Sequence, residues 1–258
     1  MFSQQRQCRA PPTPADPAQA EAEAKAEADH STESATLVNV TRHIRIGIAL
    51  AAIAVAVYAL MWVGYSRHWL TGFDAMLRPL HDYGVRHQEW VRFWNVFCTV
   101  LGPTGFRLVG AVVIVIALLK RNLRAALFLA ATILLSEYVT DVAKALAHRP
   151  RPQQALVHAA FYSFPSGHAV AVMVAVLALL TVSAHHQVQV VLGALVVISV
   201  GVGRVVLNVH YPSDVVAGWA LGYLWFFVCL VTVRPRPLTA PNPDLVLPDA
   251  AARGKAAR

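Results

Sequence analysis

The stretch that decides the fold is Lys144–Asp214, which contains three polar clusters with the sequences KALAHRPRP (144–152), PSGH (165–168) and RVVLNVHYPSD (204–214). Each cluster lies at the end of an apolar run that is long enough to cross a bilayer as a helix. A membrane would therefore bring all three clusters to one depth on one side. Cationic or titratable side chains and one carboxylate are expected to converge there.

The composition of the chain is that of an integral membrane protein. Of its 258 residues, 57% are hydrophobic and only 14% are charged, and the mean hydropathy is +0.50. These values lie outside the range of ordinary soluble proteins. The formal charge of +8 does not indicate a nucleic-acid partner, because Arg and Lys are scattered at the ends of apolar runs. Anionic headgroups and an anionic substrate explain this charge better.

Six apolar segments of helical length predict an all-α, polytopic membrane protein, built as a six-transmembrane-helix bundle. The expected spans are 46–65, 103–119, 125–146, 167–184, 188–206 and 214–233. Between the first and second spans, apolar residues recur at helical spacing in Trp69–Leu80 and Trp90–Leu101. Both segments are expected to be helices that lie in the membrane interface. Gly218 and Gly222 form a pair of small residues that predicts close helix packing inside the bundle.

The sequence divides into a membrane domain, 43–235, and two tails, 1–42 and 236–258, that we expect to be disordered and cytoplasmic. The basic turn 120–124 between the second and third spans is cytoplasmic by the positive-inside rule. With six crossings, both termini then lie in the cytoplasm. The polar clusters lie on the outer face of a plasma membrane, of the bacterial inner-membrane type. A cleavable signal peptide is not expected, because the first apolar run begins only after about forty polar residues.

Three fixed cations, Lys144, Arg151 and Arg204, have few acids near them in the sequence. Taken one by one, they could anchor lipid headgroups, as Arg and Lys at helix ends commonly do. Ser166 and Gly167 favour another interpretation, because serine is a preferred N-cap and glycine lets the backbone approach a ligand. The positive end of the helix dipole would hold an oxyanion there. Together the clusters predict a phosphate-binding site.

Two histidines add the groups that phosphoryl transfer requires. His168 follows the predicted phosphate cradle and could act on a leaving group. Asp214, four residues after His210, can hold one imidazole nitrogen protonated and leave the other free to attack phosphorus. The sequence offers no carboxylate cluster for a metal ion, and its cysteines have no metal-like or paired spacing. No metal or cofactor is expected, and the cations take the place of a divalent ion.

The three motifs resemble the signatures of the type 2 phosphatidic acid phosphatase family, which are KxxxxxxRP, PSGH and SRxxxxxHxxxD in that order. The resemblance covers about residues 44–233 and implies a six-helix bundle with its active site at the outer face. Gly203 stands where the family has serine, so one hydroxyl contact to phosphate is missing. The resemblance assigns phosphate binding to Lys144, Arg151, Ser166, Gly167 and Arg204, and catalysis to His168, His210 and Asp214.

The resemblance implies a metal-independent lipid phosphatase that hydrolyses a phosphomonoester or pyrophosphate of a lipid. His210 would form a phosphohistidine, while His168 would protonate the leaving oxygen and then deprotonate the attacking water. Candidate substrates are phosphatidic acid, phosphatidylglycerol phosphate, a polyprenyl pyrophosphate and a phosphorylated lipid A. The lipid bilayer is the other expected partner.

Two alternatives remain open at this point. A phosphotransferase of the same superfamily would pass the phosphoryl group to an alcohol instead of water. Glu137 and Asp141 lie within a predicted span, and acids inside a membrane often mark the ion path of a transporter. If the protein is a phosphatase, Asp141 is expected to face inward and hold Lys144 toward the phosphate site, and Glu137 is expected to bond to another helix.

Overall fold

The computed structural model describes residues 42, 44–160, 162–183 and 187–238, and every regular element in these ranges is a helix. The predicted all-α class is therefore confirmed. The chain divides into two units, Met1–Ala49 and Leu50–Arg258. After the helix Ile44–Ser66, the elements are α2 (Thr71–Ala75), α3 (Arg78–Arg86), α4 (Gln88–Val100), α5 (Pro103–Leu119), α6 (Leu123–Leu129), the π-helical segment η1 (Ala130–Leu134), α7 (Leu135–Ala147), α8 (Gly167–Val182), α9 (Gln187–Val206) and α10 (Pro212–Val233).

Five helical stretches of the described chain are long and apolar enough to span a membrane: Ile44–Ser66, Gln88–Leu119, Leu123–Ala147, Gln187–Val206 and Pro212–Val233. The predicted multi-pass character is confirmed, while a count of six requires α8 as a shorter crossing. α8 has 16 residues, which corresponds to about 24 Å. It contacts α5, α7, α9 and α10 and is apolar on all sides, as buried helices are. Because helices surround it, its length need not match the hydrocarbon thickness.

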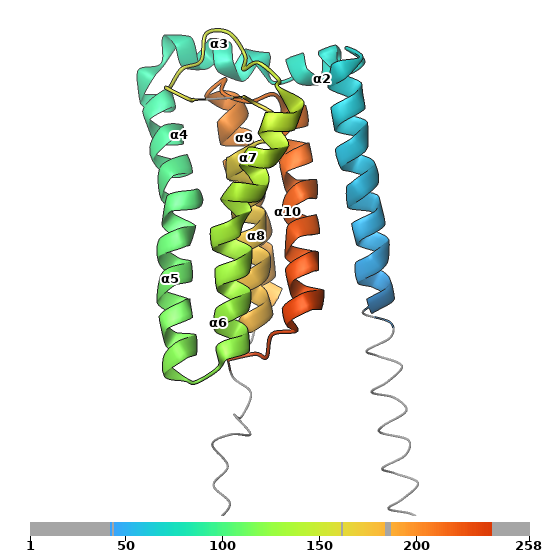
Figure 1. Cartoon of the computed structure of the whole chain (residues 1–258). Coiled ribbons are helices and arrows are strands. Elements are labelled where there is room, and N and C mark those ends of the chain that lie inside the picture. Colours follow the sequence, from blue (N-terminus) through green and yellow to red (C-terminus); the bar gives the residue numbers. More distant parts are fainter. Residues whose placement is uncertain (1–41, 43, 161, 184–186, 239–258) are drawn as a thin grey trace, which may run out of the picture. The chain divides into compact units, whose positions relative to one another are not determined.

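The segment Trp90–Leu101 differs from its predicted interfacial position. α4 continues in line with α5 (Figure 1), and the two form one apolar stretch of 32 residues. Trp94 and Phe97 pack against the core that α9 helps to build. The interfacial position of this segment is therefore not confirmed, because apolar residues at helical spacing mark a buried face equally in an interfacial helix and in a span. By contrast, α2 and α3 run across the end of the helices (Figure 1), and their place in the interface stays a prediction.

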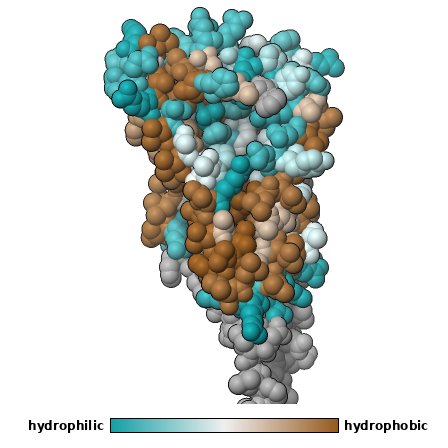
Figure 2. Space-filling model, turned by 60° about the vertical axis from the view of Figure 1, so that its left-hand side comes forward, coloured by the Kyte–Doolittle hydropathy of each residue, from teal (hydrophilic) through white to brown (hydrophobic). Residues whose placement is uncertain are grey.

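The chain brings the ends of several helices together. α7 ends, α8 begins, α9 ends and α10 begins at the end that α2 and α3 cover, and the basic turn between α5 and α6 lies at the opposite end (Figure 1). On the face shown in Figure 2, hydrophobic side chains gather below a largely hydrophilic upper end. This is the pattern expected of helices that cross a bilayer and emerge on one side.

The predicted tails fall largely outside the described residues, as does most of the predicted polar turn His185–Gln187. The described start of the second tail is bound to the lower end of the helices. Leu238 donates its amide to the Val182 carbonyl oxygen (2.8 Å). Asn122 donates its side-chain amide to the Arg236 carbonyl oxygen (3.1 Å).

Glycines in α10 allow it to pack against the backbone of α8. A Cβ atom on Gly218 would lie 2.7 Å from both Ala169 Cβ and the Ser166 carbonyl oxygen. A Cβ atom on Gly222 would lie 3.0 Å from Met173 Cβ. The predicted close packing of this glycine pair inside the bundle is confirmed. Since Ser166 precedes the first residue of α8, this packing also fixes where that helix begins.

We expect Gly218→Ala to destabilise the protein by about 1–3 kcal/mol, because the new methyl group must displace backbone atoms. Thermal unfolding in detergent measures the effect. Gly72→Ala is the matched control, since nothing lies within 4 Å of its Cβ position. Equal melting temperatures for Gly218→Ala and the unsubstituted protein would contradict the packing described here.

Candidate active site

The N-terminus of α8 lies at the centre of the candidate site. Ser166 is the N-cap residue, with extended backbone angles (φ −70°, ψ 114°). Its fully buried hydroxyl group has no hydrogen-bond partner among the described residues. A Cβ atom on Gly167 would lie 3.7 Å from Lys144 Nζ, so the ammonium group approaches the positive end of the helix dipole. Two positive groups so close together favour an anion between them.

Two arginines border the same position. Arg151 donates from Nη1 to the Val209 carbonyl oxygen (2.6 Å) and from Nη2 to the Ala160 carbonyl oxygen (2.7 Å). Arg204, in the last turn of α9, is buried, and its Nε has no hydrogen-bond partner within the described ranges. A buried, charged donor without a partner is costly. An anion bound here would remove that cost.

His210 lies between these cations and a carboxylate. Its Nδ1 is 3.5 Å from Asp214 Oδ2, and its Nε2 is 3.4 Å from Arg151 Nη1. Burial, together with the positive charges of Arg204, Arg151 and Lys144, holds the pKa of His210 well below its ordinary value of 6.5. The imidazole is therefore neutral at physiological pH. A proton on Nδ1 would face the carboxylate and leave the Nε2 lone pair directed toward the cations. At 3.5 Å the Nδ1–Oδ2 contact is longer than a hydrogen bond, and Nδ1 has no hydrogen-bond partner among the described residues.

His168 completes the set of predicted residues. It lies in the first turn of α8, and its Cδ2 is 3.0 Å from the Cβ position of Gly102, at the junction of α4 and α5. The charges of Arg204 and Lys144 act on it as well. One end of the helices thus holds every residue that the motifs predicted for the site: Lys144, Arg151, Ser166, Gly167, His168, Arg204, His210 and Asp214.

Comparison with known proteins finds a family match over the same part of the chain. Residues 125–237 match the model of the PAP2 superfamily. The matched region makes up less than half of the chain. It contains all three motifs, so the resemblance inferred from them is confirmed.

Curated proteins with similar sequences are membrane-lipid phosphatases by name. Phosphatidylglycerophosphatase B of Bacillus subtilis (strain 168) is 36% identical over 99 residues, which cover 35% of this chain and 49% of that protein. Lipid A 1-phosphatase of Rhizobium etli is 40% identical over 79 residues, which cover 31% and 32% of the two chains. Undecaprenyl-diphosphatase of Sulfolobus acidocaldarius is 43% identical over 61 residues, covering 24% and 29%. The chain spans about half or less of the length of these relatives.

A solved structure shares the fold. It is described as the crystal structure of the first transmembrane PAP2 type phosphatidylglycerolphosphate phosphatase from Bacillus subtilis. The TM-score is 0.56 at 22% sequence identity, and the match covers 71% of this chain and 93% of the other. At this identity the likeness concerns the fold alone.

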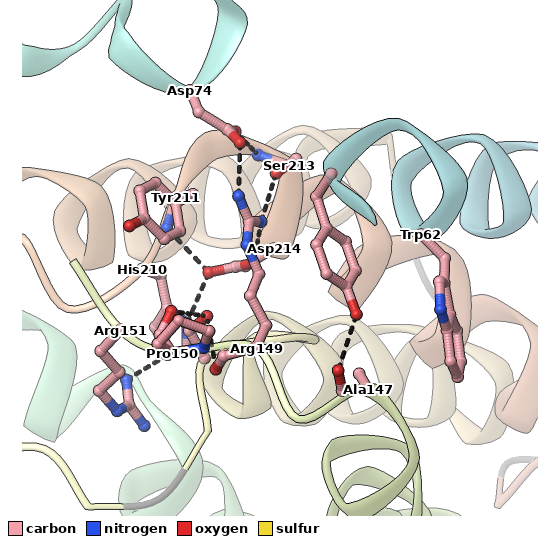
Figure 3. Close-up of polar contacts among 12 residues, drawn as sticks. Trp62, Asp74, Ala147, Arg149, Pro150, Arg151, His210, Tyr211, Ser213 and Asp214 are labelled. Carbon is pink, nitrogen blue, oxygen red and sulfur yellow. Dashed lines mark hydrogen bonds and ion pairs between the residues drawn. The ribbon is translucent and has the colours of Figure 1, made fainter. Parts of the chain in front are cut away.

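Arg149 and Asp74 are residues of the site region that sequence reasoning missed (Figure 3). Arg149 donates from Nη1 to Asp214 Oδ1 (2.6 Å) and to Ser213 Oγ (2.7 Å), and from Nη2 to Asp74 Oδ2 (2.6 Å). The sequence did carry a signal for Arg149, because Arg149-Pro150 repeats the Arg-Pro pair that ends the first PAP2 motif. Asp74 had no such signal, since it lies far along the chain in a short helix.

Asp141 and Glu137 have different surroundings from each other. Asp141 is exposed rather than directed inward, so its predicted orientation was wrong. The buried positions of α7 are Ser136, Thr140 and Ala143. They mark the face of α7 that packs against its neighbours, and the sequence alone did not determine which face that is. Glu137 does bond to another helix, as predicted. Its Oε2 lies 2.8 Å from Nη2 of Arg107 in α5.

Gly203, the one departure from the PAP2 signature, faces α4 rather than the cations. A Cβ atom there would lie 2.6 Å from Cys98 Sγ and 2.7 Å from Trp94 Cε3. The indole of Trp94 thus fills the space that a serine side chain would need. A serine at this position could reach a phosphate only if α4 moved. The sequence-based prediction that a hydroxyl contact to phosphate is missing here therefore needs correction.

We expect Gly203→Ser to lower the unfolding free energy by about 1–3 kcal/mol through this overpacking. It should not strengthen phosphate binding. The two measurements are thermal unfolding in detergent and inhibition by inorganic phosphate, with Gly72→Ser as the control for adding a serine without a clash. Tighter phosphate binding at an unchanged melting temperature would show that the serine reaches the site after all.

Proposed function

We propose that the protein is an integral membrane lipid phosphatase that hydrolyses a phosphomonoester or pyrophosphate of a lipid through a phosphohistidine on His210. The supporting observation is the setting of that side chain, which is buried and neutral, with Nδ1 toward Asp214 and Nε2 toward Arg151. The names of the similar proteins point the same way, because they denote phosphatases of phosphatidylglycerophosphate, lipid A and undecaprenyl diphosphate.

The reaction has two steps. His210 Nε2 attacks phosphorus, the bond from phosphorus to the leaving oxygen breaks, and His168 donates a proton to that oxygen. His168 must be in its imidazolium form for this step, and the negative charge of the bound phosphate favours that form by offsetting the neighbouring cations. In the second step His168 takes a proton from water, the water oxygen attacks phosphorus, and the N–P bond breaks to release phosphate. Asp214 holds the proton on Nδ1 and stabilises the positive charge that develops on the ring. Such acid–base help is typically worth about 100- to 10,000-fold in rate.

The phosphoryl oxygens are held by positive groups. Lys144, Arg151 and Arg204 neutralise their charge, and Ser166 Oγ and the Gly167 amide add hydrogen bonds at the start of α8. These donors stabilise the charge of the transition state because they are already oriented before the reaction. They supply the role that divalent ions fill in many phosphoryl-transfer enzymes, so activity in the presence of EDTA is expected.

The orientation in the membrane follows from the charges at the two ends. The basic turn of residues 120–124 lies opposite the site (Figure 1), and basic loops remain in the cytoplasm. The site then faces the outside of a plasma membrane, and both termini lie in the cytoplasm. A lipid phosphate of the outer leaflet would have its phosphate at the depth of the cations.

The two alternative functions, phosphotransferase and transporter, differ in how well they agree with the structure. A phosphotransferase would use the same intermediate and differ only in whether water or an alcohol accepts the phosphoryl group. A transporter with an ion path along Glu137 and Asp141 fits less well, because Glu137 is paired with Arg107 and Asp141 is exposed. An interior ion path needs acids that face the helix interior.

The deciding test is phosphate release in detergent with EDTA, from phosphatidic acid, phosphatidylglycerophosphate, undecaprenyl diphosphate and lipid A. We expect activity on at least one of these lipids. His210→Ala should reduce it to background, because no other group can form the intermediate. His158→Ala, which changes an exposed histidine in the loop before α8, should leave it unchanged. Phosphate release by His210→Ala at the unsubstituted rate would refute the assigned nucleophile.

We expect His168→Ala to slow an alkyl phosphate about 100-fold or more, and an aryl phosphate with an activated leaving group far less. The reason is that an activated phenolate leaves without a proton. Rates of phosphate and phenol release from the two substrates measure the difference. If both substrates slow equally, His168 binds the phosphate and does not protonate the leaving oxygen.

A further inference from the structure

Arg149 is bound in a way that excludes it from the phosphate-binding set. Its side chain is only 10% exposed, and the rings of Tyr65 and Tyr211 lie over its guanidinium carbon at 4.7 and 4.1 Å. Both of its terminal nitrogens are engaged by carboxylates. Arg151, two residues later, bonds instead to backbone carbonyl groups and approaches His210. Arg149 and Arg151 therefore have different roles.

The contact with Arg149 determines how the Asp214 carboxylate is oriented. The terminal torsion of an aspartate side chain is broad, so a carboxylate needs contacts at both oxygens to be held in one orientation. Oδ1 accepts from Arg149 Nη1 (2.6 Å). Oδ2 accepts from the Tyr211 amide (2.9 Å) and lies 3.5 Å from His210 Nδ1. If Oδ1 were released, only the Tyr211 amide would hold the carboxylate, and its terminal torsion would no longer be fixed with Oδ2 toward the imidazole.

Asp74 holds Arg149 in turn. Its Oδ2 accepts from Arg149 Nη2, and its Oδ1 accepts from the Ser213 amide (3.0 Å) at the start of α10. One carboxylate thus joins α2 to both the arginine and the helix that carries Asp214. Its negative charge also offsets part of the charge of Arg149, so that Asp214 is not the only acid the guanidinium pairs with.

We propose that Arg149, held by Asp74, is a positioning residue for the nucleophile. It fixes Asp214 so that Oδ2 faces His210 Nδ1, and this keeps the proton on Nδ1 and the Nε2 lone pair available for attack. The inference rests on the proposed function, because it assigns a role within the same reaction. It adds two residues: Arg149, which stands at an unspecified position of the first motif, and Asp74, which lies outside all three motifs.

The test uses Arg149→Lys and Asp74→Asn in the full chain. Lysine keeps the positive charge but cannot bridge two carboxylates as the planar guanidinium does. We expect kcat per folded molecule to fall about 10- to 100-fold in both variants, the range seen when groups that orient metal-bound histidines are removed. The inhibition constant of inorganic phosphate should change less than about threefold, because the interaction acts on attack and not on ground-state binding.

The leaving group gives a second readout. Because Arg149 acts through the nucleophile, its variant should slow alkyl and activated aryl phosphates by the same factor. Arg86→Lys and Asp82→Asn are matched controls on the exposed side of α3, and both should keep full activity. Size-exclusion chromatography in detergent gives the folded fraction, so that a loss of folded protein is not counted as a loss of turnover.

The third readout does not depend on activity. ¹⁵N NMR of histidine-labelled protein, with His210→Ala to assign the signal, reports which ring nitrogen of His210 carries the proton. We expect Nδ1–H in the unsubstituted protein and a mixture of both tautomers in Arg149→Lys and Asp74→Asn. If the unsubstituted protein released no phosphate but the tautomer shifted in this way, the proposed function would fail and the positioning role would stand.

Two results would overturn the inference. The first is an inhibition constant for phosphate that rises about tenfold at unchanged kcat, which would make Arg149 a ligand of the phosphate. The second is unchanged kcat per folded molecule together with an unchanged His210 tautomer. In that case Arg149 and Asp74 would only hold α2 against α10.

Discussion

The fully buried carboxylate of Asp214 is the constraint on which the arrangement of the helix ends depends. A buried charge is stable only when it is paired and hydrogen-bonded. Its partners come from separate parts of the chain: Arg149 follows α7, the Tyr211 amide precedes α10, and Asp74 in α2 orients the arginine. Because the Asp214 carbonyl oxygen also accepts from the Ser166 amide, satisfying this one residue brings the ends of four helices together.

Close packing between α10 and α8 extends the same constraint into the membrane-spanning part of the helices. α10 approaches the backbone of α8 at Gly218, and the atom it meets there is the carbonyl oxygen of Ser166. The residue that caps α8 is thus held by α10 both at its amide and at its carbonyl group. A donor that is oriented before the substrate arrives costs no reorganisation during the reaction. The glycine that looks like a simple packing residue therefore contributes to the rigidity of the phosphate cradle.

The sequence predicted those features that depend on local spacing. The apolar runs gave the spans, and the motifs gave residues such as Lys144, His168 and His210 at one depth, because each motif ends a span. Features that depend on long-range contacts escaped prediction. Asp74 and Arg149 are 75 residues apart, and the direction that Asp141 faces depends on how neighbouring helices pack around α7. The space beside Gly203 depends on Trp94 in α4, whose alignment with α5 the sequence left undetermined.

The pairing of Arg149 also explains how the proposed site keeps its positive charge. Asp74 and Asp214 are the carboxylates buried at this end of the described chain, and both are bonded to Arg149. Because one arginine pairs with two acids, Arg149, Asp74 and Asp214 together carry one negative charge in excess, which lies beside His210. The excess stabilises the imidazolium that forms during attack. Lys144 and Arg204 form no ion pair with a carboxylate among the described residues, so their charge remains for a phosphate. If Arg149 did not engage both acids, the carboxylate that activates the nucleophile would compete with the substrate for these two cations.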